Sequence, residues 1–245
     1  MLWTVPLDWR FACAIGVAVV GGLVRGTTGF GAAMVMTPAL ALLLGPRTAI
    51  PVTLLLETFA AAPMLAAAIA QARWRVITPI SSAAVLAVPL GGYLLISADP
   101  LTLRRLIALT VISFSLALLW GRRYRGAQRL PTSLALGALS GTMLGATSIG
   151  APPVILYLLS GPDTATVTRA NLTLFVMVIS AAGLVVLGVN GLLTMATLQQ
   201  AAVLALPFAG GVVAGSRLFA RFSDQRFRQI TIAFMLLVSL VVLFA

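Results

Sequence analysis

The sequence of 245 residues contains no histidine, a single cysteine and only five acidic residues. Cys13 has no partner for an intrachain disulfide, and one cysteine without histidine provides too few ligands for a zinc or haem site. The absence of histidine also removes the usual base of a nucleophilic serine, so Ser148, in a stretch that remotely resembles a hydrolase elbow, has nothing to activate it. We therefore expect no cofactor, no bound metal and no enzymatic activity.

Charge is also scarce. Charged residues make up 9% of the chain and hydrophobic residues 60%, with a mean hydropathy of +1.09. A soluble domain is about 45 to 50% apolar, and no polar stretch here is long enough to build one. The composition predicts an all-α, polytopic membrane protein with the lipid bilayer as its surroundings.

The charge that is present is one-sided, because all 16 basic residues are arginines and the net charge is +11. Nucleic-acid-binding proteins carry such an excess. Here, however, the arginines gather in short gaps between apolar segments, which is the distribution found in cytoplasmic loops of membrane proteins. We therefore expect no nucleic-acid partner.

Four of the apolar segments are shorter than the about 20 residues that a helix needs to cross the bilayer. They form two pairs, and a glycine-rich break separates the members of each pair, at residues 25–31 and 145–150. Irregular backbone at membrane depth is tolerated only where it is buried in protein or lines a cavity. The apolar segments are 11–24, 31–44, 48–70, 77–96, 103–120, 132–146, 151–160, 164–188, 195–216 and 229–245.

The two halves of the chain are similar to each other. When residues 21–40 are placed over residues 140–159, three pairs of glycines coincide, and further matches follow in the same order at offsets of 116 to 119 residues. They include AAVLAVP at 83–89 and AAVLALP at 201–207. This pattern predicts a duplication. Its parts are a first transmembrane repeat at 1–120, a cytoplasmic basic linker at 121–130 and a second transmembrane repeat at 131–245.

The arginine clusters predict the orientation of the repeats. If each short pair forms a re-entrant hairpin or two crossings, then Arg73, the linker at 121–130 and the arginines between 217 and 228 all lie in the cytoplasm. If each short pair were one broken crossing, the last cluster would lie outside. We therefore expect two inverted repeats, each with a broken or re-entrant helical hairpin plus three transmembrane helices, and both termini outside.

The breaks carry the features of an anion site. In transporters built from inverted repeats, half-helices meet near the midplane and turn their positive ends toward anions. The second half-helix of the first break is predicted to start near Gly31, and Gly29 and Gly31 permit close backbone approach. In the second break Pro152 and Pro153 mark a helix start. Because these prolines lack N–H groups, the first repeat is expected to offer more backbone donors to an anion.

Arg25 is predicted to lie inside the first break, between apolar residues. A charge at membrane depth costs about 2.5 to 3.5 kcal/mol and indicates a functional residue by default. Binding of an anionic substrate is the leading interpretation for Arg25; pairing with Glu57 and snorkelling to a surface are the alternatives. Arg169 and Asn171 form a second polar cluster, in which snorkelling of Arg169 is equally compatible with the sequence.

The hydroxyl groups in the breaks, Thr27, Thr28, Thr147 and Ser148, either bond freed helix carbonyls or contact the substrate. Glu57 is the one carboxylate in the middle of an apolar segment, which makes it the candidate for proton coupling. The predicted substrate-binding residues are Arg25, Thr28, Gly29, Phe30, Gly31, Thr147, Ser148, Gly150, Arg169 and Asn171.

The two breaks also resemble a known family. VRGTTGFGAAMVMTPAL and GATSIGAPPVILYLLSGP are similar to the paired glycine stretches of the TauE/SafE family of sulfite exporters. Ala32 and Ala151 stand where that family commonly has glycine. The resemblance covers nearly the whole chain and implies an inner-membrane transporter of sulfite, organosulfonates or similar anions, coupled to protons. The matching positions are Gly29, Phe30, Gly31 and Pro38 in the first stretch, and Gly150, Pro152, Pro153, Tyr157 and Leu158 in the second.

The sequence thus predicts a secondary active transporter whose partner is a small anionic substrate. The alternatives are a passive anion channel and a non-transporting membrane assembly protein whose polar residues only hold helices together. No GxxxxGK[ST] loop is present in this chain, which disfavours an ATP-driven pump. Transporters of this size often pair, so a homodimer is a further expectation.

Overall fold

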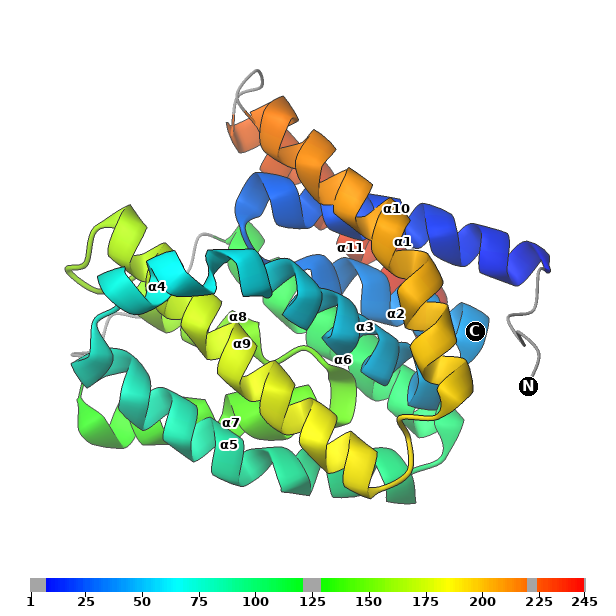
Figure 1. The fold of residues 1–245 in the computed structure, drawn as a ribbon, viewed down its shortest axis with the longest axis horizontal. Coiled ribbons are helices and arrows are strands. Elements are labelled where there is room, and N and C mark those ends of the chain that lie inside the picture. Colours follow the sequence, from blue (N-terminus) through cyan, green and yellow to red (C-terminus); the bar gives the residue numbers. More distant parts are fainter. Residues whose placement is uncertain (1–7, 121–128, 220–223, 245) are drawn as a thin grey trace.

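The computed structural model describes residues 8–120, 129–219 and 224–244, and over these ranges its regular elements are all helices (Figure 1). The all-α prediction is confirmed. In chain order the elements are α1 (Trp9–Thr28), α2 (Ala32–Leu44), α3 (Pro46–Ala61), a 3₁₀ turn η1 (Ala62–Met64), α4 (Leu65–Gln71), α5 (Trp74–Ser97), α6 (Pro100–Leu119), α7 (Leu130–Thr147), α8 (Ala151–Leu158), α9 (Ala165–Val189), α10 (Met195–Phe219) and α11 (Asp224–Phe244).

Within the described residues, six stretches are long and apolar enough to cross a membrane. This confirms a multi-pass membrane protein. A shorter apolar stretch, Met235–Phe244, lies within α11. The basic linker predicted at 121–130 falls almost entirely outside the described residues, as do residues 220–223 of the last arginine cluster. The six stretches are Trp9–Thr27, Pro46–Gln71, Trp74–Ser97, Pro100–Ala117, Thr166–Val189 and Met195–Arg217.

The prediction that the first segment is short is wrong, because α1 has 20 residues. It begins early since Asp8 caps it, with the Phe11 N–H donating to Asp8 Oδ1 at 2.9 Å. It continues past the last apolar residue because the Thr27 hydroxyl donates to the Leu23 carbonyl at 2.9 Å, within the helix itself. The first break is therefore limited to residues 29–31.

Both short pairs fold back on themselves as hairpins. A Cβ built on Gly21 of α1 would lie 2.3 Å from Cγ of Met36, so α2 returns directly along α1. Across the second hairpin the hydroxyls of Ser133 in α7 and Tyr157 in α8 lie 2.7 Å apart. The path of the chain is therefore that of a hairpin in each pair, and not of a single straight crossing interrupted by a break.

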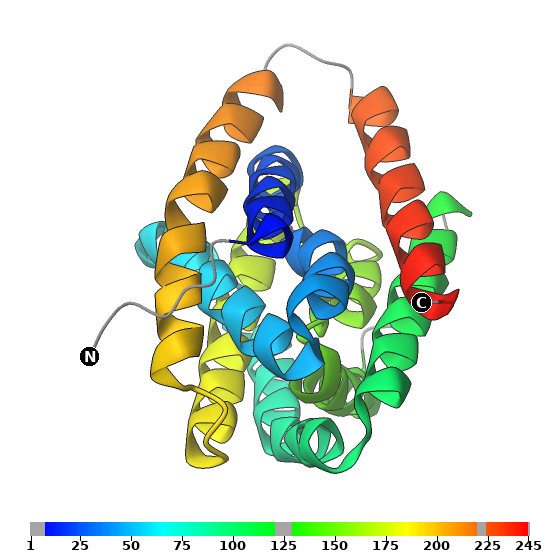
Figure 2. The same ribbon diagram turned by 90° about the vertical axis from the view of Figure 1, so that its right-hand side faces the viewer.

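Each hairpin packs against a helix of the other half of the chain. A Cβ on Gly22 of α1 would lie 2.2 Å from the Phe208 carbonyl of α10, and a Cβ on Gly141 of α7 would lie 2.0 Å from the Ala84 carbonyl of α5. Only glycine allows such close contact between helix backbones. Figure 2 shows α10 and α11 flanking the α1–α2 hairpin from two sides.

The third apolar segment, predicted as one helix over 48–70, is divided by the 3₁₀ turn into α3 and α4. Pro63 explains the division, because proline lacks the N–H that a continuous α-helix requires. The combined stretch Pro46–Gln71 still has 26 residues and the length of a membrane span. It carries Glu57 on the α3 part, directly before the interruption.

Candidate functional site

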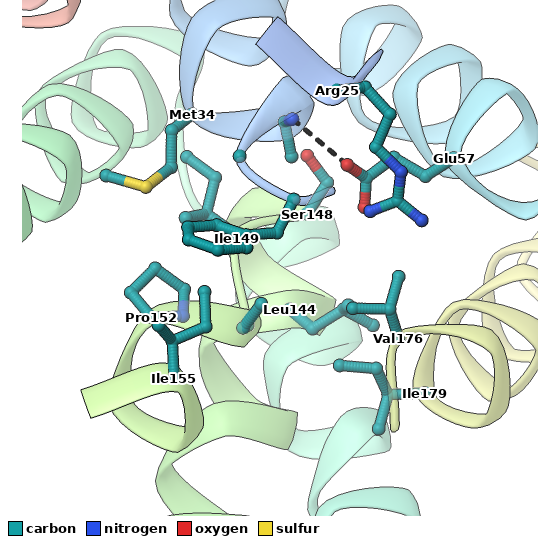
Figure 3. Close-up of a pocket in the computed structure, with 15 residues that line it drawn as sticks. Arg25, Met34, Glu57, Leu144, Ser148, Ile149, Pro152, Ile155, Val176 and Ile179 are labelled. Carbon is teal, nitrogen blue, oxygen red and sulfur yellow. Dashed lines mark hydrogen bonds between the residues drawn. The ribbon is translucent and has the colours of Figure 1, made fainter. Parts of the chain in front are cut away.

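The two hairpin turns meet at a small, partly enclosed cavity (Figure 3). We call it the inner cavity; its volume is about 20 Å³. This is room for about one water molecule. Apolar side chains of α7, α8 and α9 form much of its wall. The predicted site residues that line it are Arg25, Phe30, Gly31, Glu57, Ser148 and Gly150.

The turns share one backbone feature. The residues that follow α1 and α7, Gly29 and Ser148, both have left-handed backbones, with φ of 79° and 58°. Their N–H groups donate to the equivalent carbonyls of Arg25 and Leu144, at 2.8 and 2.7 Å. A side chain in this conformation costs about 1–2 kcal/mol, and such strain persists where the surroundings enforce it, often at functional sites. Gly31, with φ of 87°, adds a second left-handed residue to the first turn only.

Arg25 lies in the last turn of α1, and its predicted position inside the break is corrected accordingly. Its side chain is only 4% exposed. The guanidinium reaches the inner cavity, and its Nη2 atom has no hydrogen-bond partner. Snorkelling to a surface is excluded by this burial.

Glu57 lies beside Arg25 at one end of the inner cavity (Figure 3). It is 5% exposed, and its Oε1 accepts a hydrogen bond from the backbone N–H of Ala33 at 3.2 Å. The charge of Arg25 acts on this carboxylate, but within the described residues no ion-pair contact joins the two side chains. The alternative of a direct Arg25–Glu57 pair is therefore not what the structure shows.

This hydrogen bond corrects a second expectation. The sequence predicts that the N-terminus of α2 presents its N–H groups to a ligand, whereas the Ala33 donor is already bound by Glu57. The start of α2 itself agrees with the prediction, since Gly31 precedes the helix. The start of α8 agrees as well, with Pro152 and Pro153 in its first turn.

Sequence reasoning missed a chain of hydroxyl groups next to the inner cavity. Ser148 Oγ lies 2.7 Å from Thr37 Oγ1, which lies 3.5 Å from Thr53 Oγ1. All three residues are 2% exposed or less. They join the second turn to α2 and α3. A threonine in the middle of an apolar helix is too common to indicate such a contact, so no signal in the sequence identifies Thr37 or Thr53.

The other hydroxyl groups have structural roles. Thr147 Oγ1 donates to the Met143 carbonyl at 2.7 Å and accepts from the Ile149 N–H at 3.2 Å. Thr27 likewise donates to a carbonyl of its own helix α1. Thr27 and Thr147 therefore agree with the interpretation that hydroxyl groups in the breaks bond to helix carbonyls. Thr28 ends α1, and its side chain lies outside the described part of the structure.

Arg169 and Gly29 line a separate, larger cavity of about 380 Å³. We call it the vestibule. A Cβ built on Gly29 would lie 3.5 Å from Arg169 Nε, and Arg169 itself is exposed. Phe30 lines both the vestibule and the inner cavity. The predicted single site is thus divided into two compartments.

Asn171 lies in neither compartment. Its Oδ1 accepts from the Arg73 backbone N–H at 2.8 Å, and the Arg73 side chain forms a salt bridge to Asp163 at 2.5 Å. Asn171 is completely buried, with its Nδ2 atom unpartnered. Its observed role is to hold the loop between α4 and α5 against α9.

Six membrane-length stretches, and two helical hairpins that meet at a cavity lined by a buried arginine and a buried glutamate, define a multi-pass membrane protein. The family model for the sulfite exporter TauE/SafE matches residues 14–242. The chain therefore belongs to the TauE/SafE sulfite exporter family, whose members are membrane transporters of sulfite and related anions and not enzymes. The comparisons with curated proteins and with solved structures gave no match.

Proposed function

We propose that this chain is a secondary active transporter that binds small sulfur-containing anions, such as sulfite or an organosulfonate, between its two hairpin turns. The observation that carries the proposal is Arg25. A buried cation without an acceptor is costly, and Nη2 of this side chain has none at 4% exposure. An oxyanion in the inner cavity supplies the missing acceptor through a charge-assisted hydrogen bond.

Other donors converge on the same place. The Ser148 hydroxyl and the N-terminal end of α2 border the inner cavity together with Arg25. In this conformation the hydroxyl donates to the Thr147 carbonyl at 2.6 Å, and the Ala33 N–H of α2 donates to Glu57. A helix N-terminus favours negative charge. A sulfite or sulfonate group has three oxygens, enough to accept from Arg25, from the Ser148 hydroxyl and from the α2 N-terminus once the latter two are released from Thr147 and Glu57. Since the cavity has a volume of only about 20 Å³, binding of an anion requires it to expand.

Glu57 is proposed as the residue that carries the coupling proton. While ionised, its carboxylate binds the α2 N-terminus and attracts Arg25, so it uses the groups that the anion needs. Protonation removes this competition. Arg25 is the charged group that faces Glu57 in the inner cavity; the lining residues from α2, α7, α8 and α9 are uncharged.

The inverted-repeat topology is part of the proposal. α1 packs on α10, and α7 packs on α5. In the predicted alignment α1 is equivalent to α7 and α10 to α5. The two contacts are therefore equivalent, as a two-fold relation between repeats 1–120 and 131–245 requires. In Figure 1, α1 begins and α11 ends toward the same side. This supports both termini outside and the Arg73 loop in the cytoplasm. The inner-membrane location and the homodimer stay predictions.

Counterflow in proteoliposomes tests the proposal. Vesicles are preloaded with unlabelled anion and diluted into tracer, with sulfite, taurine, sulfate and acetate compared. A carrier accumulates tracer transiently above equilibrium, whereas a passive channel only equilibrates it and an assembly protein moves none. Arg25→Gln is the inactive control and Arg10→Gln, at an exposed position, is the active one. Absence of overshoot for every anion contradicts the proposal.

A further inference from the structure

The inner cavity and the vestibule share one side chain, that of Phe30. On one side of it lie Arg25 and Glu57 in a space of about 20 Å³. On the other lies exposed Arg169, in a space of about 380 Å³. Phe30 is half-buried, as expected of a residue that stands between a small compartment and a larger one.

We propose that Phe30 is a gate between an anion-binding vestibule at Arg169, on the side of the Arg73 loop, and the inner cavity at Arg25. This deepens the proposed function and rests on it, since both compartments are then steps of one anion path. The ligands are small oxyanions, sulfonates included, which meet the Arg169 guanidinium first and reach Arg25 when the aromatic ring moves aside.

The backbone around Phe30 suits such a movement. Its neighbours Gly29 and Gly31 have φ of 79° and 87°, in the region where glycine is unstrained and other residues are not. The two flanking glycines let one residue change its dihedral angles without displacing the helices on either side, as hinge positions do in closing loops. The gate is therefore carried by a three-residue turn between α1 and α2.

The equivalent residue of the second turn behaves differently. Ile149 is 1% exposed and lines the inner cavity but not the vestibule. Its turn contains Ser148, whose hydroxyl lies 2.7 Å from that of Thr37, and this contact fixes the second turn to α2. In this conformation Phe30 is partly exposed between the two compartments, whereas Ile149 is packed into the core.

Cysteine accessibility tests the gate without any transported substrate. In a Cys13→Ser background, Ser148→Cys places a thiol in the inner cavity, and Ala151→Cys is a second probe there should the first disturb the turn. The purified full chain is treated with a small anionic methanethiosulfonate that carries a sulfonate. Phe30→Ala should raise the modification rate about 10- to 100-fold, because an open state populated at about 1–10% becomes the main one.

Two controls separate gating from general loosening. Ile149→Ala shortens the equivalent side chain and enlarges the inner cavity without opening the side of Phe30, so it should raise the rate far less than Phe30→Ala does. Thr166→Cys, in the vestibule, should react equally fast with and without the Phe30→Ala substitution. The Thr166→Cys thiol should also react faster with the anionic reagent than with a trimethylammonium analogue. Addition of the Arg169→Gln substitution should remove that difference. Unchanged rates at both inner probes in Phe30→Ala, or an equal increase in Ile149→Ala, overturn the gate. Because transport is not measured, this result is independent of the counterflow result.

Discussion

The backbone N–H of Ala33 donates to Oε1 of Glu57 at 3.2 Å, so an acidic side chain of α3 lies at the N-terminal end of α2. That end of the helix is where a transported anion is expected to bind. The carboxylate therefore acts as an internal anion, and substrate and ionised Glu57 compete for the same N–H groups and the same arginine. Competition of this kind links anion binding to the protonation of one residue.

The first prediction follows from this competition. Glu57→Gln keeps an oxygen that accepts from Ala33 but removes the ionisable group. We expect pH-driven uphill transport to be lost, while exchange of labelled for unlabelled anion at equal pH continues. Proteoliposomes with and without a pH gradient measure both activities on the same preparation.

Thr173→Ala is the matched control for Glu57→Gln, because Thr173 lies 116 residues after Glu57, at the equivalent position in the predicted alignment of the two halves. It should retain both activities. If Glu57→Gln also retains both, Glu57 does not carry the coupling proton. If Glu57→Gln loses both activities because the variant does not fold, the role of the hydrogen bond between Glu57 and Ala33 is structural.

The second prediction concerns Arg25. Arg25→Gln removes the buried charge and should weaken anion binding by about 10- to 100-fold, since a hydrogen bond to a charged group contributes about 1.5–3 kcal/mol. Arg25→Lys keeps the charge but not the two-pronged geometry, and an intermediate affinity is expected. Thermal-shift titration with sulfite, sulfonates, sulfate and carboxylates provides the measurement. Equal anion-induced shifts in wild type and Arg25→Gln would assign the binding site elsewhere.

Local signals explain what the sequence could predict of this site. Gly31 and the Pro152–Pro153 pair indicate helix starts through their own backbone properties, and both starts are observed. The sequence misplaces Arg25 because helix ends are read from the last apolar residue. Arg25 and Thr27 continue α1 instead, with the threonine hydroxyl bonded within the helix.

The contacts that define the chemistry have no such local signal. Ala33 and Glu57 are 24 residues apart, and Thr37 and Ser148 are 111 apart. Which hydroxyl or N–H meets which acceptor depends on how the hairpins pack against α3, and a single sequence does not contain that information. The same reason explains why the sequence groups Arg169 with Asn171, two residues further along α9, although only Arg169 lines the vestibule.

The third prediction concerns the orientation of the chain. In a Cys13→Ser background, a cysteine at Asn190 should react with an impermeant thiol reagent from the periplasmic side only. A cysteine at Arg75 should react from the cytoplasmic side only. Both positions are exposed. A low labelling rate therefore reports the side of the membrane on which the cysteine lies, and not burial of its side chain. Labelling of Asn190→Cys from the cytoplasmic side alone would contradict the inverted repeats.

The last prediction contrasts two glycines of the first hairpin. A Cβ on Gly31 would meet only ordinary neighbours, the closest being Met235 Cε at 3.7 Å, but φ there is +87°. A Cβ on Gly26 would lie 2.1 Å from the Val212 carbonyl. Gly31→Val should therefore strain the turn by about 1–2 kcal/mol or more and abolish transport while much of the protein still folds. Gly26→Val should separate α1 from α10 and reduce the yield of folded protein. Transport rate per folded molecule, with yield from size-exclusion chromatography, separates the two effects. Full transport in Gly31→Val would mean that the left-handed turn is not part of the transport site.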